Sequence, residues 1–106
     1  MESYYKDPRM TSYYHIACYD GDKLVGYVDT VSNGLTDAYI QDLTVDPAYQ
    51  GQGIGTELMN RMIARLKEKQ IFMISVIYGN EELASFYKRF GFSQMFCGQM
   101  QTHEAE

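Results

Sequence analysis

The sequence predicts a single α/β domain of the α+β kind, with a mixed, mostly antiparallel twisted sheet and two main helices in the order β-β-β-α-β-α-β. Two patterns lead to this prediction. The first half contains short runs rich in β-branched and aromatic residues, separated by turn signals. Apolar residues then recur every four positions, as in an amphipathic helix. A chain of 106 residues, 45% of them hydrophobic, can bury one core but not two, so residues 1–106 are treated as one domain.

Three strands are expected before the long helix, and a turn signal follows each of them. They cover residues 12–19, 23–31 and 37–46. Turns that contain Gly21 and Gly34 join the strands, and Pro47 stops the third strand. Residues 1–11 form a tyrosine-containing lead-in that either packs against the domain or frays.

The third strand has an irregular apolar pattern. Ala38 and Ile40 share one phase of the strand, whereas Leu43 and Val45 share the other. An extra residue in the strand, which is a β-bulge, would bring both pairs to one face. A strand buried on both faces would give the same pattern, and periodicity alone does not separate the two interpretations.

The long helix is expected between residues 53 and 70, and a strand follows it. The helical repeat is formed by Ile54, Leu58, Met62 and Leu66. Residues 71–78 are a continuous apolar run of strand length, which is typical of a central, buried strand.

A second helix begins after Asn80, whose side chain can cap it, and ends at Gly91. Its apolar stripe consists of Leu83, Phe86, Tyr87 and Phe90. Residues 92–102 are expected to form a short edge strand, the last β element of the predicted order.

Composition excludes several classes of function. The net charge is −5, with 9 basic against 14 acidic residues, which argues against a nucleic-acid partner. No apolar run is long enough to span a membrane and no signal peptide is recognisable, so a cytoplasmic protein without a membrane partner is expected. The 2 cysteines and 2 histidines lack the spacing of a zinc site, so no metal is predicted.

The segment LTVDPAYQGQGIGT carries the clearest chemical signal. Gly51, Gly53 and Gly55 precede or open the long helix, where bare backbone N–H groups meet the positive end of the helix dipole. Such a loop binds an anion, most naturally a phosphate or pyrophosphate. Neither the dinucleotide fingerprint nor the Walker A pattern is present. The alternative is a glycine-rich connection without a ligand.

Two motifs in this sequence resemble those of the GNAT superfamily of N-acetyltransferases. Residues 50–55, QGQGIG, resemble the Q/R-x-x-G-x-G/A signature, and the preceding L-x-V-x-P-x-Y also agrees. Asn80, followed by Tyr87 and then by Gly91-Phe92, resembles the N-x6-Y-x3-G-F element. The resemblance implies a GNAT-like sheet that splays at a bulge in the third strand, and acetyl-CoA as cosubstrate.

The resemblance also implies roles for individual residues. The loop and helix start would hold the cofactor pyrophosphate, the end of the third strand would pair with the pantetheine arm, and Asn80 would contact the cofactor. Tyr87 would contact the cofactor sulfur as general acid or hydrogen-bond donor. The implied cofactor-binding residues are Leu43, Thr44, Val45, Gln50, Gly51, Gln52, Gly53, Ile54, Gly55, Thr56, Asn80 and Tyr87.

The sequence departs from the family pattern around the acceptor. Many relatives have a glutamate base where Gln41 stands, so either the adjacent Asp42 removes the proton through a water or the enzyme uses a weakly basic amine. Gln50 and Gln52 replace basic loop residues, and Lys88 or Arg89 would lie near the 3′-phosphate.

The family's usual first strand and first two helices have no counterpart in this sequence. The acceptor cleft is therefore expected to be open, or to be completed by a second copy in a homodimer. The leading interpretation is an acetyl-CoA-dependent N-acetyltransferase that acts on a primary amine of a small molecule or peptide by direct attack in a ternary complex. The alternative is a non-catalytic acyl-CoA-binding or interaction module.

Overall fold

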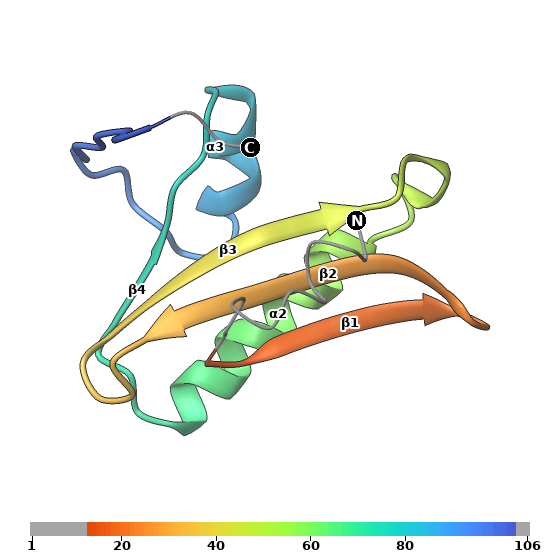
Figure 1. Cartoon of the computed structure of the whole chain (residues 1–106), viewed down its shortest axis with the longest axis horizontal. Coiled ribbons are helices and arrows are strands. Elements are labelled where there is room, and N and C mark those ends of the chain that lie inside the picture. Colours follow the sequence, from red (N-terminus) through yellow and green to blue (C-terminus); the bar gives the residue numbers. More distant parts are fainter. Residues whose placement is uncertain (1–12, 104–106) are drawn as a thin grey trace.

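The computed structural model describes residues 13–103, so the predicted lead-in over residues 1–11 lies outside the described residues. The element order β-β-β-α-β-α confirms the prediction as far as the second helix. Figure 1 shows the elements β1 (His15–Asp20), β2 (Lys23–Ser32), β3 (Asp37–Val45), the short 3-10 helix η1 (Pro47–Tyr49), α2 (Ile54–Glu68), β4 (Met73–Val76) and α3 (Glu82–Lys88).

The sheet has the strand order β1-β2-β3-β4. The first three strands are antiparallel, and β4 is parallel to β3, which confirms a mixed, mostly antiparallel sheet. Gly21 has a φ of 60° in the tight turn between β1 and β2, a conformation that glycine adopts without strain. In the next turn, the Asn33 side chain accepts hydrogen bonds from the backbone N–H groups of Leu35 and Thr36, both at 2.9 Å.

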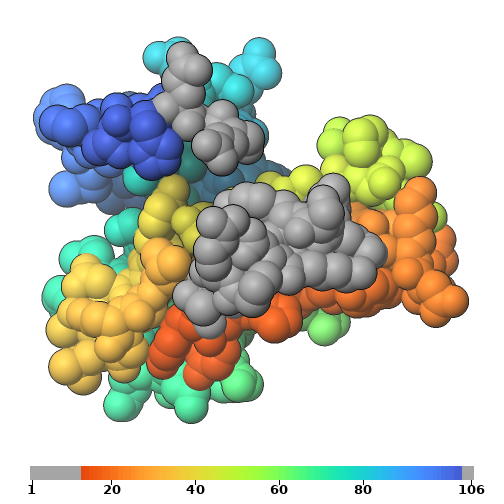
Figure 2. All heavy atoms as spheres, viewed as in Figure 1, coloured from red at the N-terminus to blue at the C-terminus, as the bar shows by residue number. Residues whose placement is uncertain are grey.

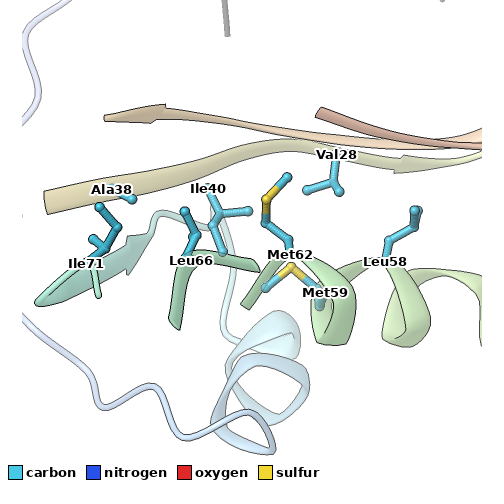
Figure 3. Close-up of a cluster of buried hydrophobic side chains, with 8 residues drawn as sticks. All are labelled: Val28, Ala38, Ile40, Leu58, Met59, Met62, Leu66 and Ile71. Carbon is cyan, nitrogen blue, oxygen red and sulfur yellow. The ribbon is translucent and has the colours of Figure 1, made fainter. Parts of the chain in front are cut away.

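The helix α2 covers one face of the sheet and supplies half of the core, as its four-residue repeat predicts. Met59, Met62 and Leu66 are completely buried against β2 and β3. Burying each such side chain contributes about 1.5–3 kcal/mol. Figure 3 shows the cluster, which consists of Val28, Ala38, Ile40, Leu58, Met59, Met62, Leu66 and Ile71.

Gly26 on β2 lets the first turns of α2 approach the sheet closely. A Cβ atom at this position would lie 2.9 Å from Cγ2 of Ile54 and 3.1 Å from Cδ1 of Leu58. Both distances are shorter than ordinary carbon contacts, so a larger residue here would force the side chains of Ile54 and Leu58 to shift. Gly26 therefore lets the first turns of α2 fit closely against β2.

The register between β2 and β3 confirms the predicted β-bulge. Tyr27 pairs with Thr44 and Asp29 pairs with Gln41, so β3 contains one more residue than β2 between these pairs. Asp42 lies at the bulge with a φ of 61°, in the left-handed region. The extra residue brings Leu43 to the face on which Ile40 packs against α2.

Two predictions for the C-terminal half are wrong. Residues 92–102 form no strand, because their apolar residues do not alternate: the neighbours Met95 and Phe96 are both largely exposed, and Gly98 follows. The strand predicted over residues 71–78 is shorter, and it lies at the edge of the described sheet rather than at its centre. No helix within residues 13–103 is long and apolar enough to span a membrane.

Candidate active site

The strands β3 and β4 separate halfway along β3. β4 pairs with β3 only between Asp37 and Ile40, and the chain leaves the sheet after Val76. Beyond the bulge, β3 continues beside β2 alone, and Figure 1 shows β3 and β4 diverging from that point. The edge of β3 over residues 41–45 that faces away from β2 therefore has no strand partner among the described residues. Of the predicted pantetheine-binding residues, Leu43, Thr44 and Val45 all lie on this segment.

The glycine-containing loop lies at the end of this free edge and leads into α2. Gly51 and Gly53 have φ values of 83° and 85°, and a Cβ at either position would meet nothing within 4 Å. Gly53 is the N-cap of α2, with no side-chain hydrogen bond at the cap. The first helical hydrogen bond runs from Glu57 N–H to the Gly53 carbonyl, which leaves the preceding N–H groups, at residues 54–56, as donors for a ligand. In Figure 2 the yellow-green segment between β3 and α2 projects from one end of the molecule.

The charges around the loop are compatible with an anion. Glu57 in the first turn of α2 is paired with Arg61, with 2.8 Å between Nε and Oε2. The Arg89 guanidinium lies 5.3 Å from the centroid of the Phe86 ring, and that ring is 4.0 Å from the position of a Cβ on Gly55. The Arg89 guanidinium therefore packs on an aromatic ring that lies beside the first turn of α2.

The two glutamines of the loop differ in what they contact. The Gln50 side chain donates a hydrogen bond from Nε2 to the Val45 carbonyl at 3.0 Å, so it contacts β3. Gln52 is exposed, and Thr56 is half-buried in the first turn of α2. Backbone groups rather than these side chains are therefore the donors that the loop offers.

Asn80 and Tyr87 lie at the two ends of α3. The Asn80 side chain accepts a hydrogen bond from Leu83 N–H at 3.1 Å, so its predicted local role as a helix cap is confirmed. The Tyr87 ring stacks on the Tyr78 ring with centroids 5.0 Å apart. Burial, together with the neighbouring Tyr39 and Tyr78 hydroxyls, raises the pKa of Tyr87. Its hydroxyl is consequently protonated at neutral pH.

Asp42 faces a second carboxyl group that the sequence analysis did not identify. Asp29 on β2 is 0% exposed, and its Oδ2 accepts a hydrogen bond from the Tyr27 hydroxyl at 3.2 Å. Burial, then the charge of Asp42 and a hydrogen bond with it, raise the pKa of Asp29 to about 7, although hydrogen bonds from Tyr27 and Gln41 act in the opposite direction. Asp29 and Asp42 thus form a carboxyl pair beside the bulge.

Nothing in the local sequence separates Asp29 from an ordinary exposed strand residue. Its neighbours, Val28 and Thr30, are typical of a strand with one exposed face. Only the register, which sets Asp29 opposite Gln41, brings it next to the bulge. No group of three or more His, Cys, Asp or Glu side chains within residues 13–103 could hold a metal ion.

Tyr39 on β3 interacts electrostatically with both Asp42 and Tyr87. Burial, followed by the charges of Asp42 and Cys97, raises the pKa of Tyr39. Tyr39 in turn contributes to the raised pKa of Tyr87. Asp42 of the carboxyl pair and the protonated hydroxyl of Tyr87 therefore both lie within electrostatic range of Tyr39, next to the place where β3 and β4 diverge.

Comparisons with known proteins agree with this geometry. Residues 1–92 match the family model of the acetyltransferase (GNAT) family. The chain is 36% identical over 70 residues to GCN5-related N-acetyltransferase 2, chloroplastic, from Arabidopsis thaliana, and 34% identical over 70 residues to histone acetyltransferase TAP1 from Glycine max. These alignments cover 66% of this chain but only 27% and 30% of the two relatives.

A solved structure of a GNAT-family acetyltransferase from Streptococcus pneumoniae TIGR4 is similar to this fold. Its TM-score is 0.74 at 31% sequence identity, and the match covers 90% of this chain and 74% of the other. The family model spans most of the chain, and a member of that family shares this fold. The chain therefore belongs to the GNAT acetyltransferase family.

Proposed function

We propose that this protein transfers an acetyl group from acetyl-CoA to a primary amine of a small molecule or peptide, by direct attack in a ternary complex. The observation that carries the proposal is the divergence of β3 from β4 after Ile40. It leaves a free backbone edge that begins at the glycine-containing loop and ends beside Asp42 and near Tyr87. An extended acyl-carrying arm needs such a path between an anion-binding loop and reactive side chains.

The chain offers one set of groups for each part of the cofactor. The N–H groups of residues 54–56 and the loop glycines would bind the pyrophosphate at the positive end of α2. Leu43 and Val45 would pair with the pantetheine amides as an added strand, and a pantetheine N–H would replace Gln50 Nε2 at the Val45 carbonyl. Arg89, or the adjacent Lys88, would interact with the 3′-phosphate.

Tyr87 and the β3 backbone would assist the bond changes. The amine nitrogen forms a bond to the thioester carbonyl carbon, an oxyanion develops, and the carbon–sulfur bond breaks with its electron pair on sulfur. A β3 backbone N–H near Leu43 would stabilise the oxyanion. Because the pKa of Tyr87 is raised, its hydroxyl would donate a hydrogen bond to the sulfur rather than transfer its proton fully. Asp42 would receive the proton that the amine loses.

Charge and relatives support an amine as the acceptor. The protein has a net charge of −5, which attracts cationic molecules at long range. The Arabidopsis relative is named as an N-acetyltransferase and the Glycine max relative as a histone acetyltransferase. Holding both reactants in the correct orientation would supply most of the rate increase.

A non-catalytic acyl-CoA-binding module is the second candidate. Gln41 favours it, because an amide cannot serve as a base at the position where many relatives have a glutamate. The two candidates share the cofactor site and differ only in turnover.

Two measurements test the proposal together. Release of the CoA thiol is followed with acetyl-CoA and a panel of amines that includes a polyamine, an amino sugar, a lysine peptide and a peptide with a free N-terminus. The thermal shift caused by CoA is measured in parallel. Thiol release that requires an amine supports the transferase, and stabilisation by CoA without turnover supports the binding module. No turnover and no stabilisation would contradict both.

A further inference from the structure

The carboxyl groups of Asp29 and Asp42 come from adjacent strands and meet beside the bulge. Asp29 lies opposite Gln41 in the register, and the left-handed backbone of Asp42 lies one residue further along β3. The interaction of the Asp42 side chain with Asp29 is one of the causes that raise the pKa of Asp29. Burial and the charge of Asp42 disfavour the ionisation of Asp29, so the pair retains one proton below about pH 7.

Each carboxyl group also has an oxygen that lacks a donor. Asp29 Oδ1 and Asp42 Oδ2 are both buried and accept no hydrogen bond from any described residue. A buried acceptor without a donor is unusual in a folded protein, and a bound water or a ligand group would satisfy it. An ammonium group carries three donors and a positive charge, and it fits a pair of acceptors of this kind.

Among residues 13–103, no ion pair neutralises either carboxyl group. Tyr27 donates a hydrogen bond to Asp29 Oδ2, and the Gln41 side chain lowers the pKa of Asp29. The His15 ring stacks on the Tyr27 ring with centroids 6.1 Å apart, and Tyr39 lies within the range of the Asp42 charge. Among the described residues, the ion pairs involve Asp46 and Glu57, and neither member of the carboxyl pair takes part in one. Within the described part of the chain, the negative charge of the pair is therefore not balanced by an ion pair.

We propose that Asp29 and Asp42 hold one proton between them and together bind and deprotonate the ammonium group of the acceptor, with Asp29 as a positioning residue that acts through Asp42. This inference rests on the proposed acetyl transfer. The N–H bond of the ammonium breaks, its proton moves to the Asp42 carboxylate, and the nitrogen keeps the electron pair that attacks the thioester. Asp29 fixes the position of the Asp42 carboxylate beside the bulge, because the two side chains interact across the β2–β3 pairing.

The requirement for this base depends on the basicity of the amine. At pH 7 about one in 2,500 lysine-like amines of pKa ~10.4 is unprotonated, compared with about one in seven α-amines of pKa ~7.8. A variant in which Asp42 is a less effective base should therefore slow acetylation of a lysine side chain more than acetylation of a peptide N-terminus. A purely structural role of Asp29 would slow both to the same extent.

The test uses two peptides of equal length, one with a blocked N-terminus and a single lysine, the other with a free N-terminus and no lysine. The value of kcat/KM is measured with acetyl-CoA between pH 6 and 9 for wild type, Asp29→Asn, Asp42→Asn and the control Asp22→Asn. Asp22 is an exposed acid in the turn between β1 and β2, so its variant removes the same charge elsewhere. We expect Asp29→Asn to lose at least ten times more activity with the lysine peptide than with the other, and its acidic limb to move to lower pH. Equal losses of kcat/KM with the two peptides, together with an unchanged acidic limb of the pH profile, would overturn the inference.

A titration that needs no turnover completes the test. Carbon-13 NMR of the aspartate carboxyl groups should show one group in wild type that titrates near neutral pH. This signal should be absent from Asp29→Asn and should move to lower pH in Asp42→Asn. An ordinary midpoint for Asp29 in wild type would overturn the inference even if Asp29→Asn does not fold. If wild type releases thiol with neither peptide nor any other amine, the proposed function is what fails, and this inference fails with it.

Discussion

The hydroxyl of Tyr87 is the group that we propose donates a hydrogen bond to the cofactor sulfur. Its ring packs on Tyr78, so the Tyr87→Phe variant should keep the fold. We expect kcat to fall roughly 10²–10³-fold, the usual effect of removing one donor to a developing negative charge. The control is Tyr78→Phe, which removes a hydroxyl from the ring stacked on Tyr87. Steady-state kinetics with acetyl-CoA check this prediction, and an unchanged kcat in Tyr87→Phe would remove Tyr87 from the mechanism.

Asp29 should make the stability of the protein depend on pH. Its pKa rises from 3.8 to about 7 on folding, so the folded protein keeps a proton that the unfolded chain releases between these pH values. The folded state therefore loses stability relative to the unfolded state as the pH rises from 4 to above 7, by an amount on the order of a few kcal/mol. Asp29→Asn removes this dependence.

Urea unfolding at pH 4.5 and pH 8 measures the effect. The free energy of unfolding of Asp29→Asn, minus that of wild type, should be larger at pH 8 than at pH 4.5. A difference that stays constant with pH would show that Asp29 titrates at the same pH in the folded and unfolded protein.

At the scale of the element, two glycine-to-alanine variants can distinguish the backbone strain in the loop before α2 from its binding of a ligand. Gly53 and Gly34 both have positive φ values, and a Cβ at either position would meet no atom closer than 3.6 Å. Substitution by alanine should destabilise the protein by a similar amount in both cases, about 1–2 kcal/mol. Only Gly53→Ala should also weaken the binding of CoA, since Gly34 lies in the turn between β2 and β3, at the opposite end of β3 from the loop. Thermal unfolding and calorimetric titration with CoA give the two quantities, and equal CoA affinities would argue against an anion site at this loop.

The elements differ in how far the sequence determines them. α2 follows directly from its four-residue repeat, because one apolar stripe faces one sheet. The bulge is ambiguous in the sequence, since the change of phase between Ile40 and Leu43 also fits a strand buried on both faces. Asp29 cannot be recognised as a site residue from the sequence, because its position beside the bulge depends on a strand pairing with residues distant in the chain. The strand expected over residues 92–102 is wrong for a similar reason: high strand propensity does not supply a partner or a buried face.

At the scale of the whole molecule, the proposed cofactor would connect parts that are weakly joined without it. α3 is 7 residues long and has no fully buried residue, and it contacts the core through partly buried rings such as Phe86 and Phe90. CoA bound along β3 would contact α2, β3 and Tyr87 at the same time. We expect hydrogen exchange to slow in residues 43–56 and 77–91 when CoA binds, with little change in β1 and β2. Mass spectrometry of exchanged peptides checks this, and protection confined to residues 50–56 would contradict the proposed path of the pantetheine arm.

The edge of β3 that has no strand partner among the described residues has a consequence for the handling of the protein. Free N–H and C=O groups along an extended segment can pair with a strand of another molecule and so start aggregation. The largely exposed side chains of Met95, Phe96 and Met100 add apolar surface in the C-terminal segment. A coenzyme that occupies the edge would act as a protective additive as well as a reactant, and concentrated samples should be kept with CoA at all stages of purification and storage.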